Sequence, residues 1–302
     1  MTNQHVIVVD SACRVSVDIG RVKFDSRNGT PIFVAPSDIA AVSLDHPGIG
    51  LTSAALRCLA ESGAVVVISD SRHLPVGLVV PWRRKAASAH RLRSQFAFGG
   101  GPLRRETWRD VIRSKLIMQA HVLRKLGRGG ALRIERLAST IDPDTVEHAE
   151  SQGARHYFRR LFDGEFKRTK RGAEDPLNVR LNYGYAIARA LVARAFAMTG
   201  LALEIGVGHQ NSENPMNLAD DFVEPFRPVV DYVVHGIVQA GDLTAEFKGA
   251  EKARVAGFVE ATVRMGDEDW RIPAAIQRIT DSFTRLVEGA EVTIPLPVGF
   301  SF

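Results

Sequence analysis

The chain has 302 residues, of which 45% are hydrophobic and 24% are charged, and it carries a formal net charge of +5. This length allows two domains or one large domain, and the composition is ordinary for a globular protein. No uninterrupted apolar run approaches the roughly 18 residues that predict a membrane span. The first residues lack the pattern of a secretory signal, and Cys13 and Cys58 are too far apart for a C-x-x-C motif. We therefore expect a cytoplasmic protein with reduced thiols and no membrane partner.

The first 80 residues have a β-strand pattern. Short runs rich in β-branched residues alternate with turn signals such as Asn28-Gly29. One helix is expected at 52–62, because Thr52 and Ser53 are good N-caps and Gly63 is a typical stop. The expected strands are 5–9, 14–18, 21–25, 32–34, 39–44, 65–69 and 76–80.

The pattern becomes helical after the sequence Pro81-Trp-Arg-Arg-Lys85, which we interpret as a domain boundary. The tail 292–302 is rich in Pro and Gly and is expected to be an extended arm. Strands followed by helices predict an α+β protein: a small β-sandwich-like domain at 1–82 and a larger all-α domain at 83–302. The expected helices are 85–97, 103–126, 143–162, 176–199, 216–239, 248–264 and 272–288.

Positive charge is concentrated in the middle of the chain. Residues 83–171 contain 22 Lys and Arg against 9 Asp and Glu, whereas 172–302 contain 11 against 18. Such a concentrated field indicates a polyanion partner, although a solvated basic surface remains the alternative. Arginine dominates and aromatic residues are sparse, which favours contacts with backbone phosphates over base stacking. The basic residues that we expect to make these contacts are Arg83, Arg84, Arg155, Arg159, Arg160, Lys167, Arg168, Lys170 and Arg171.

Three acidic residues follow a glycine-hinged histidine. On a helix, Asp220, Asp221 and Glu224 would share roughly one face, and their mutual repulsion would need an offsetting charge. A cation, Arg227 or the helix dipole could supply it, or the acids could simply be solvated. Gly206 and Gly208 would let the backbone aim His209 back at these acids, although a single histidine is more often structural than a ligand.

Glu150 is the candidate for a third ligand, although spacing alone does not rank it above Glu147, and it could instead pair with Arg155 on a helix surface. A set of carboxylates with one imidazole suits Mg²⁺ or Mn²⁺ better than a structural zinc. Such a cation could polarise a phosphate and stabilise the attacking and leaving oxygens.

Four passages in this order resemble the CRISPR-associated integrase family of spacer acquisition, the first of the universal adaptation proteins. They are E-S-Q-G-A-R-H-Y-F (150–158), L-N-Y-G-Y-A-I (181–187), G-V-G-H (206–209) and N-L-A-D-D-F-V-E-P-F-R-P-V-V-D (217–231). Each passage alone is weak evidence, whereas four in series are strong evidence. The short chain and the wording of residues 208–228 are most similar to the version that accompanies type II systems.

The resemblance implies metal ligands at Glu150, His209 and Glu224, with Asp221 as a further acid near the metal. Many relatives have Asp where Glu224 stands, so the longer side chain is a departure from the family pattern. The resemblance also implies a homodimer formed through the β domains, and a heterohexamer in which two dimers flank a dimer of the small CRISPR-associated protein two. The activity implied is a metal-dependent endonuclease and integrase, in which 3′-hydroxyls of a short double-stranded prespacer attack phosphodiesters of the CRISPR leader–repeat. His209 would then be a ligand and not the general base.

Two other functions are compatible with these residues. A non-catalytic DNA-binding scaffold would use the same basic surface without a metal. A metal hydrolase of small phosphate esters would use the same acids and histidine, but the strongly basic middle of the chain is excessive for a small substrate.

Overall fold

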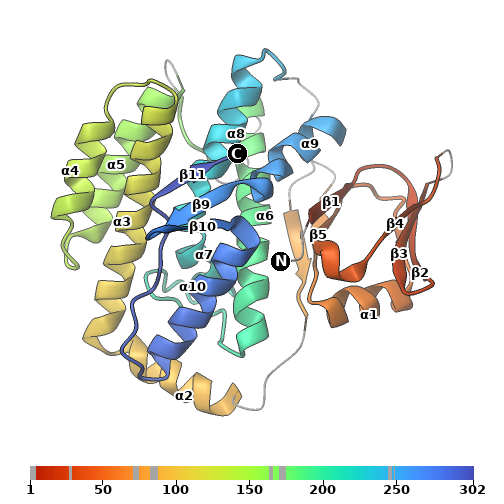
Figure 1. Ribbon diagram of the computed structural model, residues 1–302, viewed down its shortest axis with the longest axis horizontal. Helices are drawn as coiled ribbons and strands as arrows, with labels where there is room; N and C mark the ends of the chain where they lie inside the picture. Colours follow the sequence, from red (N-terminus) through yellow and green to blue (C-terminus); the bar gives the residue numbers. More distant parts are fainter. Residues whose placement is uncertain are drawn as a thin grey trace.

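The computed structural model describes residues 5–26, 29–70, 75–81, 88–162, 166–169, 175–243, 247 and 249–302. A β-rich N-terminal region lies beside a larger, mostly helical C-terminal region (Figure 1). This arrangement confirms the mixed α+β class predicted from the sequence. The predicted boundary between residues 82 and 83 lies outside the described residues.

The N-terminal region contains two four-stranded sheets and one helix. The order of the first sheet is β1-β5-β7-β8, in which the first three strands are parallel and β8 is antiparallel to β7. The order of the second sheet is β4-β3-β2-β6. The bounds are β1 His5–Val9, β2 Cys13–Asp18, β3 Arg21–Ser26, β4 Ile32–Val34, β5 Ile39–Leu44, β6 Gly50–Leu51, α1 Ser53–Ser62, β7 Val65–Ser69 and β8 Pro75–Val79.

Alternation along β7 divides its side chains between two cores. Val66 packs with residues of both sheets and with Leu59 of α1 in a small N-terminal core. Val65 and Val67 point to the opposite face and belong to the large core of the helical region. Because side chains of a strand alternate in direction, the first sheet is a shared layer that joins the two regions.

Helix α1 begins and ends at the residues that its sequence predicts. Thr52 is the N-cap, and its hydroxyl oxygen accepts a hydrogen bond from the N–H of Ala55 at 3.2 Å. Gly63 ends the helix with a φ of +81°, a conformation that glycine adopts without steric cost.

The helical region is built around α3 and α6, each of 24 residues. α3 packs against α4 and α5, and α6 packs against α8, α10 and the first sheet (Figure 1). The bounds are α2 Ser88–Gly99, α3 Pro102–Lys125, α4 Ala131–Thr140, α5 Val146–Leu161, α6 Pro176–Thr199, α7 Asn217–Phe222, α8 Arg227–Gln239, α9 Gly249–Ala256 and α10 Ile272–Val287. No helix within the described part of the chain is long and apolar enough to cross a membrane.

The prediction that the C-terminal domain is all-α is wrong, because the region contains a three-stranded antiparallel sheet of order β10-β9-β11. Its strands are β9 Thr262–Met265, β10 Glu268–Arg271 and β11 Gly299–Ser301. The tail, for which the sequence predicts an extended arm, supplies β11 and buries Phe300. Four-residue strands give too short an alternation to distinguish from the end of a helix, which explains why 248–264 was predicted as helical throughout.

Two further helix predictions differ from the structure. α4 was not predicted; it begins directly after the glycine-rich turn that ends at Gly130. The helix predicted at 216–239 is divided into α7, a 3₁₀ turn at Glu224–Phe226, and α8. Pro225 and Pro228 have no N–H to donate to the preceding turn, which explains the interruption. The interruption matters because it places Glu224 on the turn and not on a regular helix.

A fully buried ion pair joins the two regions, between Asp45 after β5 and Lys252 on α9. Replacing Lys252 by Met removes the ammonium that neutralises a buried carboxylate. We expect a loss of about 3–5 kcal/mol in the free energy of unfolding, measured by urea denaturation. The double variant Asp45→Leu/Lys252→Met should recover most of this loss, and a Lys252→Met protein as stable as the parent would contradict the assignment.

Candidate metal and nucleic-acid site

The loop 206–209 is wrapped around the carboxylate of Asp221, which is fully buried on α7. One oxygen accepts hydrogen bonds from the N–H groups of Val207 and Gly208, the latter at 3.1 Å. The other oxygen accepts from the N–H of His209 at 2.8 Å and from its Nδ1, also at 2.8 Å. A single buried side chain therefore sets both the backbone of the loop and the direction of the imidazole.

The orientation of His209 leaves Nε2 as the ring nitrogen available to a ligand. The side chain of His209 is 40% exposed, so part of the imidazole can be reached from outside. The hydrogen bond to Asp221 raises the pKa of His209 in spite of partial burial, and burial raises the pKa of Asp221 in spite of its contacts with His209. A carboxylate that holds one imidazole nitrogen while the other faces a metal is the usual arrangement behind a metal-binding histidine.

The two glycines of this loop are required by close packing. A Cβ on Gly208 would lie 2.2 Å from the ring of Trp108, and a Cβ on Gly206 would lie 2.3 Å from the carbonyl oxygen of His209. Trp108 in turn packs against His209 edge to face, with ring centroids 5.5 Å apart. The sequence predicts that these glycines let the backbone direct His209 toward the acids. In the structure, their lack of a side chain leaves room for the indole of Trp108 and for the carbonyl oxygen of His209.

Glu150 and Glu224 lie on either side of one cation. The Nζ atom of Lys115, on α3, is 2.6 Å from Glu150 Oε1 and 2.6 Å from Glu224 Oε2. α5 approaches α3 closely at Gly153, where a Cβ would lie 2.3 Å from Leu116, and this contact brings Glu150 within reach of Lys115. The fold therefore gathers two of the three predicted ligands around a single positive charge.

The charges of this group stabilise one another. Burial favours the neutral acid, but the positive charges of Arg227 and Lys115 outweigh it and hold the pKa of Glu224 well below its usual range. Burial would also lower the pKa of Lys115, but Glu224 and Glu150 outweigh it and raise that pKa. Arg227 lies 3.2 Å from the second oxygen of Glu224. Glu224 is therefore held as a buried carboxylate with a cation at each oxygen.

Asp220 does not join the other acids, so the shared acidic face predicted from the sequence is not formed. Its carboxylate pairs with Arg189 at 2.8 Å and accepts a hydrogen bond from Asn214 at 2.7 Å. The three acids therefore have three separate sets of partners. The break at the 3₁₀ turn turns Glu224 toward α3, while Asp220 stays on the α6 side.

The residues suit a divalent cation, although the described residues contain no ready-made group of three or more His, Cys, Asp or Glu side chains close enough to hold one. Two carboxylates already share one cation, the Lys115 ammonium, so their oxygens are placed to share another. His209 and Glu224 also perturb one another's pKa, which places the imidazole in the same electrostatic neighbourhood. Oxygen ligands with one imidazole are the donor set that Mg²⁺ and Mn²⁺ accept.

A cavity of about 660 Å³ opens beside Glu150, and we call it the basic cavity. Four of the predicted phosphate contacts line it, together with Lys115 and Arg227: they are Arg155, Arg159, Lys167 and Arg168. Asn178 and Asn182 fix the guanidinium of Arg168 through hydrogen bonds of 2.8 and 2.6 Å. The sequence places the positive charge only in the middle of the chain. The fold places part of it beside the two glutamates.

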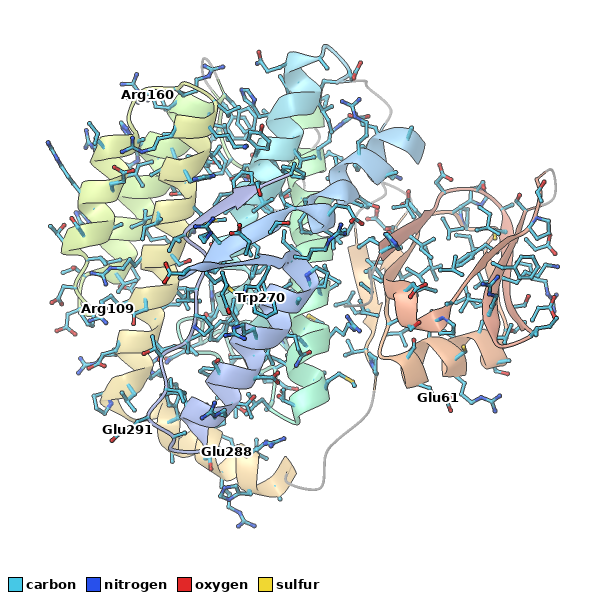
Figure 2. The ribbon with its side chains drawn as sticks, viewed as in Figure 1. Glu61, Arg109, Arg160, Trp270, Glu288 and Glu291 are labelled. Atoms are coloured by element: carbon cyan, nitrogen blue, oxygen red, sulfur yellow. The ribbon has the colours of Figure 1, made fainter. Side chains whose placement is uncertain are left out.

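None of the other predicted contacts is among the described residues that line this cavity. Arg160 is exposed near the C-terminal end of α5, at the upper end of the group α3–α5 in Figure 2. Arg83, Arg84, Lys170 and Arg171 lie outside the described residues. Aromatic rings also line the basic cavity, namely those of Phe158, Phe166 and Tyr185. The sequence shows no aromatic pattern that would predict this grouping.

Asp231 is a buried carboxyl at the wall of the basic cavity, and it accepts a hydrogen bond from the hydroxyl of Tyr185. Burial raises its pKa from 3.8 to about 6, although the hydrogen bond with Tyr185 opposes the shift. The folded state thus binds this proton more tightly than the unfolded chain does. The contribution of Asp231 to stability must therefore fall as pH rises from about 4 to 6, by roughly 3 kcal/mol, and stay low above that range.

We expect the variant Asp231→Asn to lose this part of the pH dependence. The measurement is the free energy of unfolding of both proteins between pH 4 and 7, taken from urea denaturation. Parallel curves for the parent and the variant would contradict the raised pKa.

A model of a known protein family matches residues 6–262, and its description is "CRISPR associated protein Cas1". The chain belongs to the Cas1 family. A CRISPR-associated endonuclease Cas1 of Neisseria meningitidis serogroup C is 32% identical over 258 residues, which cover 85% of this chain and 84% of the relative. A Cas1 endonuclease of Pyrobaculum aerophilum is 31% identical over 253 residues, covering 80% of this chain and 84% of the relative. The family predicted from the four passages is therefore confirmed.

Solved structures with the Cas1 fold resemble this chain over nearly its whole length. A casposase bound to an integration product superposes with a TM-score of 0.76 at 19% identity, covering 96% of this chain and 95% of that one. A Cas1 protein from Thermotoga maritima superposes with a TM-score of 0.75 at 14% identity, covering 96% and 98%. At these identities the superpositions show a shared fold, including the β-rich front and the helical back.

Among the described residues, Lys115 is the cation between the two glutamates that sequence reasoning missed. Its position could have been found, because Trp108, Ile112, Gln119 and Leu123 follow the same helical spacing and are all buried. A lysine among buried positions of a helix needs a buried counter-charge. The four passages that resemble the family contain the acids and the histidine. The lysine that joins the two glutamates lies on α3, outside those passages.

Proposed function

We propose that this Cas1-family chain is a metal-dependent DNA endonuclease and integrase that inserts short DNA fragments into a CRISPR array by 3′-hydroxyl transesterification. The observation that carries the proposal is that Glu150 and Glu224 share one cation at the edge of the basic cavity. The curated relatives are named CRISPR-associated endonucleases, and a casposase with the same fold is bound to an integration product.

Each residue of the site has a distinct part in this proposal. Glu150, Glu224 and the Nε2 atom of His209 would hold Mg²⁺ or Mn²⁺, which would supply Lewis-acid stabilisation of charge on phosphate oxygens. Asp221 keeps the imidazole in one orientation through Nδ1 and so keeps His209 as a ligand. Because Asp221 engages Nδ1, we assign His209 no role as general base.

The basic cavity positions the DNA. Arg155, Arg159 and Lys167 place positive side chains beside the glutamates, where they bind backbone phosphates without reading sequence. Arg168 is already held by two asparagines, so little side-chain freedom is lost when it meets a phosphate. Positioning of the attacking 3′-hydroxyl then comes from the bound DNA and needs no covalent enzyme residue.

The proposed partners are double-stranded DNA and the small CRISPR-associated protein two. One solved neighbour is a Cas6–RT–Cas1–Cas2 complex, and another is a Cas1–DNA complex from a protein called TtCas1. For this chain we propose a homodimer formed through the N-terminal region, with two dimers flanking a dimer of protein two.

A strand-transfer assay with a metal series tests the proposal. The chain and its cognate protein two are mixed with a labelled duplex and a supercoiled plasmid that bears the leader and repeat, in Mg²⁺, Mn²⁺ or EDTA. We expect label in the plasmid with either metal and none in EDTA. If the amount of labelled plasmid were the same with and without the chelator, the result would favour a non-catalytic DNA-binding scaffold.

A further inference from the structure

Lys115 occupies the position between two proposed metal ligands, although it lies outside the four passages quoted above. Its side chain is 9% exposed, and its Nζ atom lies 2.6 Å from an oxygen of Glu150 and 2.6 Å from an oxygen of Glu224. Arg227 holds the other oxygen of Glu224 at 3.2 Å. Both oxygens of the buried Glu224 are therefore already engaged by cations of the chain itself.

A divalent ion that takes Glu224 must displace one of these two cations. Arg227 contacts Glu224 and stacks on Tyr185 with its guanidinium 5.1 Å from the ring centroid, so its position is fixed from a second side. Lys115 alone touches both glutamates, and its ammonium stands on a flexible four-carbon stem. A metal shared by Glu150 and Glu224 therefore replaces the ammonium of Lys115.

The basic cavity can accommodate the displaced ammonium of Lys115. Lys115 lines the basic cavity together with Arg155 and Arg159, and a cavity of about 660 Å³ leaves room for its side chain to swing away from the glutamates. That space already carries several positive charges, so a bound anion would stabilise another ammonium there. A DNA phosphate supplies such an anion.

We propose that Lys115 is an internal counter-cation that fills the metal position in the metal-free protein and moves into the basic cavity when a divalent cation binds. The proposal rests on the assignment of Glu150 and Glu224 as ligands made above. It makes metal binding and DNA binding mutually reinforcing: the metal releases a positive charge toward the DNA, and the DNA stabilises the released charge.

The unaltered chain provides the first test, through acylation of lysines by N-hydroxysuccinimidyl acetate read by mass spectrometry. In EDTA the amine of Lys115 is enclosed by two carboxylates and should react slowly. Adding Mn²⁺ should raise its labelling severalfold, while Lys125 on the same helix should be unaffected. Labelling of Lys115 that stays constant or falls with Mn²⁺ would overturn the proposal.

The second test is the affinity for Mn²⁺, measured by electron paramagnetic resonance of the free ion. Lys115→Gln removes the competing cation, so we expect Mn²⁺ to bind at least about tenfold more tightly, which corresponds to roughly 1.4 kcal/mol. Lys125→Gln makes the same charge change on α3 away from the glutamates and should leave the affinity unchanged. Equal or weaker Mn²⁺ binding by folded Lys115→Gln would also overturn the proposal.

The two tests separate this inference from the proposed function. If the unaltered chain does not bind Mn²⁺ at all, the assignment of the metal site fails and this inference fails with it. If Mn²⁺ binds and is lost in Glu224→Gln, but Lys115 reactivity and affinity do not respond, only the role of Lys115 is wrong. Should Lys115→Gln fail to fold, labelling of the unaltered chain decides alone.

Discussion

Replacing His209 by Ala is expected to reduce strand transfer by more than about 100-fold, beyond the typical loss from changing a residue that merely supports a metal ligand. In the proposed site the Nε2 atom of His209 would be the nitrogen ligand, and alanine offers none. DNA binding should persist, because the arginines and lysines of the basic cavity do not contact His209. Both properties can be measured on one preparation, by plasmid labelling and by a gel-shift titration at fixed salt.

His148→Ala is the matched control for this variant. His148 is an exposed histidine on α5 that contacts Gln152 and none of the proposed ligands. It should retain strand transfer. If His209→Ala retained full strand transfer, His209 would not be a metal ligand and its role would be structural.

Replacing Asp221 by Asn should damage both the stability of the chain and the metal site. The buried carboxylate accepts hydrogen bonds from three backbone N–H groups and from His209, and an amide must turn its NH₂ group toward some of these donors. We expect a loss on the order of 3 kcal/mol in the free energy of unfolding. The loosened imidazole should also weaken Mn²⁺ binding by about 10- to 100-fold.

Asp220→Asn provides the same chemical change one residue away. Asp220 is partly exposed and pairs with Arg189, whose side chain is 33% exposed, so its loss should cost no more than about 1 kcal/mol. It should weaken Mn²⁺ binding far less than Asp221→Asn does, because Asp220 forms no hydrogen bond with His209 and acts on the imidazole only through its charge. If the two variants behaved alike, the distinct role given to Asp221 would be wrong.

The elements that depend on local patterns were predictable from the sequence. Strands β1 to β5, β7 and β8 have runs of β-branched residues, and α1 has a clear N-cap and a glycine stop. The C-terminal sheet was not predictable in the same way, because β9 and β10 have four residues each and β11 pairs with β9 across more than 30 residues of sequence. Pairing over that separation leaves no local periodicity.

The candidate site was predictable for residues linked by short sequence distance and unpredictable for the rest. His209 and Asp221 lie 12 residues apart, and the structure has them hydrogen-bonded. Asp220 has the same chemistry as Asp221, and a one-residue step around α7 gives it a different partner. Lys115 lies 35 residues before Glu150 and reaches it because Gly153 lets α5 approach α3, a tertiary contact that spacing does not encode.

The most direct test of the central claim compares two labelled duplexes that differ only at their 3′ ends, one with 3′-hydroxyls and one with 3′-deoxy ends. Each is mixed with the chain, its cognate protein two, Mn²⁺ and the leader–repeat plasmid. The account predicts covalent transfer of label from the 3′-hydroxyl duplex alone, since the hydroxyl is the nucleophile. Equal labelling by both duplexes, or binding of both without any joined product, would contradict it.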